Sequence, residues 1–223
     1  PIIHEVFPEM VNAVKNGVIK ESRIDDAVLR TLGVKYDYGF FEENSKVGIK
    51  DPSKAAEGIK NEKVEKICVD SARKAVKVLR DDQNLLPLDP SKKVLLVEQI
   101  NPMHLNANSQ HCHPSIFWEK MLEHSENVGS VETDLIFSGN TKKRIQDRYN
   151  EADVIVITNY YGRRTLDGNA FVKEIVSWGK PTIVVTNSPF GFTVLPEYKS
   201  VVCTYGCSTE SLESAAMAIY GKL

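Results

Sequence analysis

The chain has 223 residues, with 28 lysine and arginine residues against 30 aspartate and glutamate residues. Without a basic excess it lacks the electrostatic field that gathers nucleic acid, so nucleic-acid binding is not expected. The longest apolar runs are far too short to cross a bilayer, and no membrane span is expected. A chain of this length can bury one large core, or one core plus a piece of a second domain, and the pattern below favours the second arrangement.

Two short amphipathic helices are predicted within residues 1–40. Between Ile2 and Gly17 apolar residues recur at helical spacing, and Gly17 can end that helix. Ser22 is predicted to cap a second helix that ends before Gly33. The two helices cannot bury their apolar faces against each other alone. They need a partner surface, either the rest of this chain or a part that would precede it.

A linker is predicted at residues 41–60, because residues 36–53 are rich in turn formers and lack sustained periodicity. From Asn61 to Arg80 apolar residues recur at helical spacing, which predicts one long helix. The next stretch, Asn84–Leu88, is expected to lie extended across an apolar surface. Residues 61–223 are assigned to a single domain.

Strand-like apolar runs alternate with helix-length segments through that domain. The clearest run, Val154–Ile157, is entirely β-branched and too short for a buried helix, so it predicts a strand covered on both faces. The other predicted strands are Val94–Gln99, Val131–Phe137, Thr182–Thr186 and Val201–Tyr205. This alternation predicts an α/β fold, a flavodoxin-like three-layer sandwich whose mainly parallel sheet has the order 2-1-3-4-5. Val131–Phe137 is placed at an edge.

In this order, the crevice between the first and third strands, at their carboxyl ends, is the expected place of function. The loop after the third strand carries Asn159, Tyr161, Arg163 and Arg164. Two adjacent arginines can grip a carboxylate or a phosphate of a ligand. Tyrosine and arginine are also enriched at protein interfaces, so an interface role stays open.

The loop after the first strand contains His111, Cys112 and His113. Alternate residues of an extended loop can face one metal ion, but a zinc site needs one or two further ligands, and no spacing marks them. The second interpretation is that His111 and His113 pack locally or contact a neighbouring domain. No metal is assigned.

Phosphate-binding motifs do not occur in the chain. There is no G-x-G-x-x-G after the first strand and no G-x-x-x-x-G-K-S/T, so no cofactor is predicted. Ser188 and Ser208 follow predicted strands, but neither lies in G-x-S-x-G, and Ser208 is predicted to cap the last helix. Spacing and composition therefore yield no catalytic set.

Five segments of the chain form an ordered set of sequence motifs. They are Arg30-Thr31-Leu32 with Gly39-Phe40-Phe41, Ala72-Arg73-Lys74-Ala75 with Val78-Leu79-Arg80, Asn84-Leu85-Leu86-Pro87-Leu88, Lys180–Val185 and Ser214–Gly221. In this order they resemble segments of glycoside hydrolase family 3 and span nearly the whole chain. One departure is Arg80, where the family usually has lysine.

The resemblance implies that residues 1–40 are the last helices of a (β/α)₈ barrel, which accounts for their unpartnered apolar faces. Family members are retaining glycosidases whose nucleophile is an aspartate of that barrel. The barrel signature K-H-F-P-G-H does not occur here. No catalytic residue is therefore expected in this chain, and the chain alone is expected to be inactive.

Two smaller motifs, Val97-Glu98-Gln99 and His113-Pro114, resemble the bacterial two-domain β-N-acetylglucosaminidase branch of the family. In the glucosidase branch the acid/base is a glutamate after the central strand, whereas Tyr160–Thr165 contains no carboxylate. The resemblance thus implies an amino-sugar substrate of cell-wall or chitin type and a barrel of the same protein as the partner domain. It suggests a cell-envelope or secreted protein, with the cytoplasm left open. The alternative is a stand-alone flavodoxin-like module that binds a small ligand or a protein at the crevice.

Overall fold

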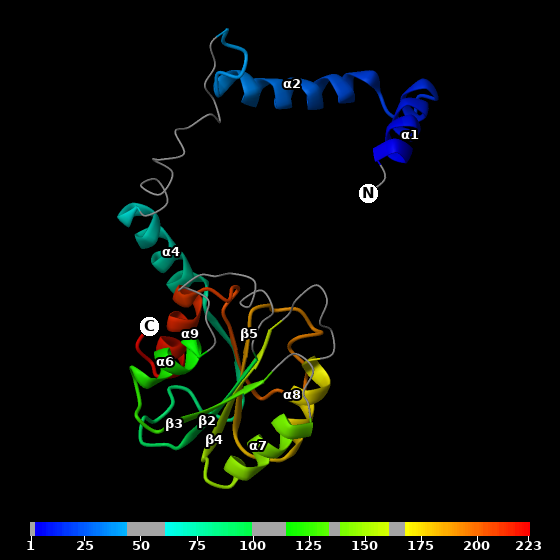
Figure 1. Cartoon of the computed structure of the whole chain (residues 1–223). Helices are drawn as coiled ribbons and strands as arrows, with labels where there is room; N and C mark the ends of the chain where they lie inside the picture. The colour runs from blue at the N-terminus through cyan, green and yellow to red at the C-terminus, as the bar shows by residue number, and fades with distance from the viewer. Residues whose placement is uncertain (1–2, 44–60, 100–114, 134–138, 161–167) are drawn as a thin grey trace. The chain divides into compact units, whose positions relative to one another are not determined.

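A computed structural model describes residues 3–43, 61–99, 115–133, 139–160 and 168–223 (Figure 1). The chain forms two compact units, Pro1–Asn61 and Glu62–Leu223. In the described part of the chain no helix is both long and apolar enough to cross a membrane. The assignment of residues 1–40 to a barrel and of residues 41–60 to a linker stays a prediction.

The first unit contains helices α1 (Ile3–Lys15) and α2 (Glu21–Asp37), and neither helix has a buried residue. Gly17, at φ 70°, follows α1 as expected. The predicted limits of α2 are wrong, because Ser22 lies inside its first turn and the helix continues through Gly33. A glycine within a helix costs about 1 kcal/mol relative to alanine, which the turns on either side can offset.

The second unit is built on a sheet that has six strands in the described part of the chain. These are β1 (Lys77–Asp81), β2 (Val94–Gln99), β3 (Val128–Thr133), β4 (Val154–Asn159), β5 (Thr182–Thr186) and β6 (Ser200–Cys203). Their order is β1-β6-β5-β4-β2-β3, and each pair is parallel except β1 with β6. The five predicted strands keep the expected order 2-1-3-4-5, and the α/β class is confirmed.

Helices cover both faces of this sheet (Figure 1). They are α6 (Ile116–Leu122) and α9 (Thr209–Ile219) on one face, and α7 (Gly139–Tyr149) and α8 (Gly168–Ser177) on the other. A further helix, α4 (Glu62–Ala75), packs against α9. One core cluster joins α6 and α9 to Leu96 and Val156, and the other joins α7 and α8 to Val97 and Ile157. Since successive strand residues point to opposite faces, β2 and β4 contribute to both clusters, which explains why Val94–Val97 and Val154–Ile157 are apolar without interruption.

The predicted helix from Asn61 to Arg80 is wrong at its C-terminal end. α4 ends at Ala75, and β1 begins at Lys77, which pairs with Cys203 of β6. Helical spacing cannot separate a last helical turn from a five-residue strand, because both patterns fit so few residues. Here the distant edge of β6 provides backbone partners and decides in favour of the strand.

One edge strand and one helix cap lie close to where the sequence predicts them. β3 begins at Val128, three residues before the predicted start, and lies at the edge of the sheet as expected. Ser208 caps α9, and its hydroxyl oxygen accepts a hydrogen bond from the backbone N–H of Ser211. The cap prediction is confirmed, because Ser208 adopts the extended backbone conformation that an N-cap needs.

Candidate functional site

The sheet changes its direction of growth between β2 and β4. The chain passes from β2 outward to β3 and then returns to β4 on the other side of β2. Doubly wound folds bind ligands at the carboxyl ends of the strands at such a point. The described residues at this place are Glu98, Gln99, Asn159 and Tyr160, and all four are buried.

Side-chain hydrogen bonds hold the ends of β2 and β4 together. The backbone N–H of Gln99 donates to Oγ1 of Thr158 over 2.7 Å, and the backbone N–H of Tyr160 donates to Oε1 of Gln99 over 2.7 Å. Each strand therefore satisfies a backbone group of the other through a polar side chain. This arrangement makes the switch point a fixed part of the fold.

Glu98 is a carboxylate in the core, with only 4% of its surface exposed. It lies on the face of β2 covered by α6, and the backbone N–H groups of Phe117 and Trp118 hydrogen-bond to it. Burial is the largest effect on its pKa, and the charges of Glu132 and Glu119 act in the same direction. Together they raise the pKa of Glu98 to about 7, against the opposing effect of the two N–H groups.

The phenol of Tyr160 lies on the same face of the sheet and is 3% exposed. Burial first, and then the charges of Glu98 and Cys207, raise its pKa well above the ordinary value for tyrosine. The phenol therefore stays neutral at physiological pH. It can donate one hydrogen bond and accept others.

Four buried polar atoms at this edge of the sheet have no hydrogen-bond partner among the described residues. They are Oε2 of Glu98, Nε2 of Gln99, Oγ1 of Thr133 and the phenolic oxygen of Tyr160. Buried polar groups are nearly always paired, so an unpaired atom needs an explanation. The switch point therefore combines the expected position of a ligand site with polar atoms that no described residue satisfies.

Of the site residues predicted from the sequence, Asn159 is described. It is buried, and its side-chain Nδ2 donates to the backbone oxygen of Thr193 over 2.9 Å, so this hydrogen bond ties β4 to the segment after β5. Outside the described residues lie Tyr161, Arg163, Arg164, His111 and His113. Their roles as ligand or interface residues stay predictions.

The sequence pattern did not single out Glu98 or Gln99 as individual site residues. Glu98 stood out only within the motif Val97-Glu98-Gln99. A usable signal was present, because a carboxylate that directly follows an apolar run in a doubly covered strand has no solvent to face. The position of α6 over Glu98 was not contained in that signal.

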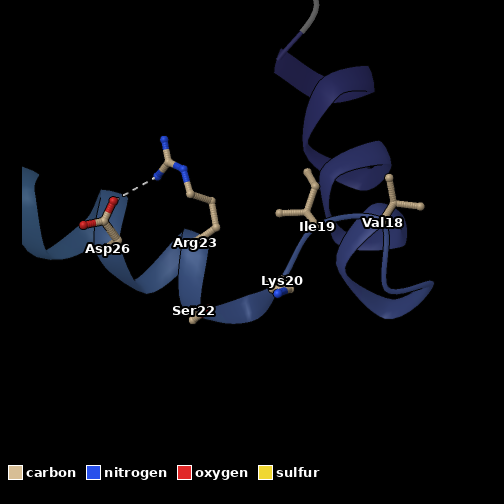
Figure 2. A pocket seen from close by; sticks show the side chains of 6 residues that line it. All are labelled: Val18, Ile19, Lys20, Ser22, Arg23 and Asp26. Atoms are coloured by element: carbon tan, nitrogen blue, oxygen red, sulfur yellow. Dashed lines mark hydrogen bonds and ion pairs between the residues drawn. The ribbon is translucent and has the colours of Figure 1, made fainter.

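The first unit contains a hollow of its own (Figure 2). Its volume is about 470 Å³, and its lining residues are Val18, Ile19, Lys20, Ser22, Arg23 and Asp26. Arg23 and Asp26 pair over 3.4 Å, and both side chains are exposed. This hollow therefore lacks buried, unpaired polar groups of the kind found at the switch point. Across the described residues, no group of three or more histidine, cysteine, aspartate or glutamate side chains is placed to hold a metal ion.

No known family profile matches the sequence, and no curated protein is significantly similar to it. Solved structures do match. A β-glucosidase from Listeria innocua is 20% identical with a TM-score of 0.64, over 95% of this chain and 32% of its own. A glycoside hydrolase family 3 β-N-acetylglucosaminidase from Paenibacillus sp. str. FPU-7 is 20% identical with a TM-score of 0.63, over 95% of this chain and 40% of its own. A structure of a fungal multi-domain family 3 β-N-acetylglucosaminidase is 17% identical with a TM-score of 0.61, over 97% of this chain and 24% of its own.

The chain has a fold found in glycoside hydrolase family 3. The resemblance read from the ordered motifs is thereby confirmed at the level of fold. Because the matches cover at least 95% of this chain, they include most of the first unit as well as the sandwich. The chain spans only 32% to 40% of the first two matched chains, so the family 3 fold is shared with a part of each larger protein.

Proposed function

We propose that this chain is the C-terminal α/β domain of a retaining family 3 glycoside hydrolase, preceded by the last helices of its barrel. The observation that carries the proposal is the match of nearly the whole chain to about a third of larger glycosidases. The ordered motifs support it independently, because they are a property of the sequence alone. In this proposal the catalytic aspartate belongs to the barrel, and this chain contributes no catalytic residue.

The first unit supports a barrel partner through its exposed apolar surface. Phe7 is 65% exposed and Met10 is 44% exposed on α1, while Leu29 is 67% exposed on α2. Amphipathic helices of this kind gain most of their stability from packing their apolar face on another element. A barrel of the same protein would supply that surface, and the sandwich would then support the barrel.

Within the family, we assign the parent enzyme to the β-N-acetylglucosaminidase type, acting on amino sugars of cell walls or chitin. The supporting feature is the sequence Tyr160–Thr165, which has no carboxylate where the glucosidase branch carries its acid/base. The structural neighbours include both β-glucosidases and β-N-acetylglucosaminidases, so the choice depends on this sequence segment.

Two assays test the proposal. The chain Pro1–Leu223 and the product of its entire coding region are each incubated with 4-nitrophenyl N-acetyl-β-glucosaminide and, as a matched control, with 4-nitrophenyl β-glucoside. We expect the short chain to hydrolyse neither and the full product to prefer the amino sugar. Turnover by the short chain would refute the absence of catalytic residues, and preference for the glucoside would refute the branch.

A second candidate is a non-catalytic module that binds a small ligand or a protein at the switch point. The unpaired atoms of Glu98, Gln99 and Tyr160 favour it, since they mark hydrogen-bonding capacity at the expected ligand position. A coding region that adds no barrel-sized segment to this chain, together with no hydrolysis of either substrate, would select this second candidate.

A further inference from the structure

Helix α6 rests with its first turn on the carboxyl end of β2. Its side chains Phe117 and Met121 are fully buried in the core cluster on that face of the sheet. The backbone N–H groups of Phe117 and Trp118 hydrogen-bond to the carboxylate of Glu98. The contact between α6 and β2 therefore combines apolar packing with one buried acid.

The two carboxylate oxygens of Glu98 have different surroundings. Oε2 has no hydrogen-bond partner among the described residues, whereas the carboxyl group as a whole interacts with the backbone N–H groups of Phe117 and Trp118. A neutral carboxyl group tolerates a buried position far better than a carboxylate does, because the ion loses its hydration there. An ionised Glu98 thus needs water or another donor at Oε2, and at 4% exposure the folded chain leaves this side chain almost no contact with solvent.

The charged groups that act on Glu98 from neighbouring elements are acidic. Glu132 lies directly opposite it on β3, and Glu119 lies on α6. On the β4 side the nearby titratable group is the neutral phenol of Tyr160. Lys120 of α6 is engaged elsewhere, because its ammonium group pairs with Glu123 and with Glu213 of α9.

We propose that the protonation state of Glu98 controls how tightly the first turn of α6 packs on β2. The protonated carboxyl group keeps this turn in place, and loss of the proton loosens it as water reaches Oε2. The hydrogen bonds from the N–H groups of Phe117 and Trp118 favour the ion, but burial and two like charges outweigh them. This property belongs to the sandwich itself and does not depend on the proposed glycosidase activity.

Trp118 reports directly on the position of α6. Its Nε1–H donates to the backbone oxygen of Val128 over 2.8 Å, and the chain has one other tryptophan, Trp178. In the Trp178→Phe chain we therefore follow Trp118 emission and the exchange protection of the Phe117 and Trp118 amides. Between about pH 5.5 and about pH 8.5 we expect one transition toward a more exposed indole, with its midpoint near 7 and unchanged far-UV ellipticity.

Three variants of the Trp178→Phe chain assign this transition. Glu98→Gln abolishes it, because the amide does not ionise. Glu132→Gln shifts its midpoint to lower pH, because a like charge is removed. His124→Gln leaves it in place, which separates it from any effect of His124, two residues beyond the end of α6.

A flat Trp118 signal in the parent chain, or an unchanged transition in Glu98→Gln, would overturn the proposal. If Glu98→Gln does not fold, the carbon-13 shift of the Glu98 carboxyl carbon decides instead. Titration of that carbon without a response of Trp118 would equally refute the control of α6, while coincident titration of both would support it.

Discussion

The first unit and the sandwich differ in what their apolar residues contact. In α1 and α2 no residue is buried, whereas Ile155 and Ile157 of β4 are 0% exposed. Both regions have clear apolar patterns in the sequence. The difference shows that an apolar sequence pattern predicts which face of a helix or strand is apolar, but not which surface covers that face. The sandwich supplies both sides of its core from one chain, and the described part of the first unit does not.

The largest expected effect separates a core position from an exposed one. Ile155→Ala should lower the free energy of unfolding of the sandwich by about 4 kcal/mol, because it removes a fully buried side chain and leaves a cavity. Phe7→Ala should change it by less than about 0.5 kcal/mol, because the ring is 65% exposed. Urea denaturation followed by circular dichroism measures both. Similar losses for the two variants would show that α1 has a packing partner within this chain.

The next effect concerns the acid inside the sandwich. Below about pH 4.5 Glu98 is protonated in both states, but as pH rises toward 7 the unfolded chain loses this proton more readily than the folded one. The sandwich should lose roughly 3 kcal/mol across this window and stay less stable above it. Glu98→Gln should remove this loss, as measured by urea denaturation at pH values on both sides of the window. The matched control, Glu9→Gln on the exposed surface of α1, should keep it.

The sequence was sufficient to predict the strands that are buried on both faces. Runs such as Val154–Ile157 predict a strand without ambiguity, because a strand covered on both faces is the short element that buries every side chain. It was not sufficient for β1. Val78 and Leu79 fit a helical stripe as well as a strand, and the partner that selects the strand, β6, lies far away in the sequence. A local sequence pattern cannot predict an element such as β1, whose secondary structure depends on pairing with a strand that is distant in the sequence.

The candidate site also has one property that the sequence predicts and one that it does not. Its position at the ends of β2 and β4 follows from the strand order, which the sequence predicted. The state of Glu98 does not follow from it, because its burial depends on how α6 covers β2 and on Glu132 of the neighbouring strand. Three-dimensional packing, and not residue type, makes this glutamate unlike an exposed one such as Glu9.

A smaller effect tests the edge strand that the sequence missed. The carboxylate of Asp81 accepts hydrogen bonds from the backbone N–H groups of Leu85 and Leu86, both over 3.0 Å, and from Oγ of Ser200 over 2.7 Å. Burial raises the pKa of Asp81, but these hydrogen bonds outweigh it and lower the pKa below 3.8. Asp81→Asn should therefore reduce stability by about 2 kcal/mol near neutral pH, by urea denaturation.

The sign of the pH dependence follows from the lowered pKa of Asp81. Its stabilising contribution is complete above 3.8 and declines as the pH falls through the folded-state pKa, so the two chains should converge in acid. The adjacent residue Asp82 is exposed and serves as the control. An equal loss for Asp82→Asn would show that charge near β1, rather than the hydrogen bonds of Asp81, holds this edge.

The smallest effect compares the helix caps of the two regions. Ser208→Ala should cost the sandwich about 1 kcal/mol, because the backbone N–H of Ser211 loses its acceptor at the start of α9. Lys20 precedes α2 with the same extended backbone but offers no side-chain acceptor, so Lys20→Ser should raise the helical ellipticity slightly. The sandwich must not gain stability from Lys20→Ser, since α2 contributes no buried residue. A gain would mean that the first unit and the sandwich unfold together, and the contrast between a helix with a partner and one without would then fail.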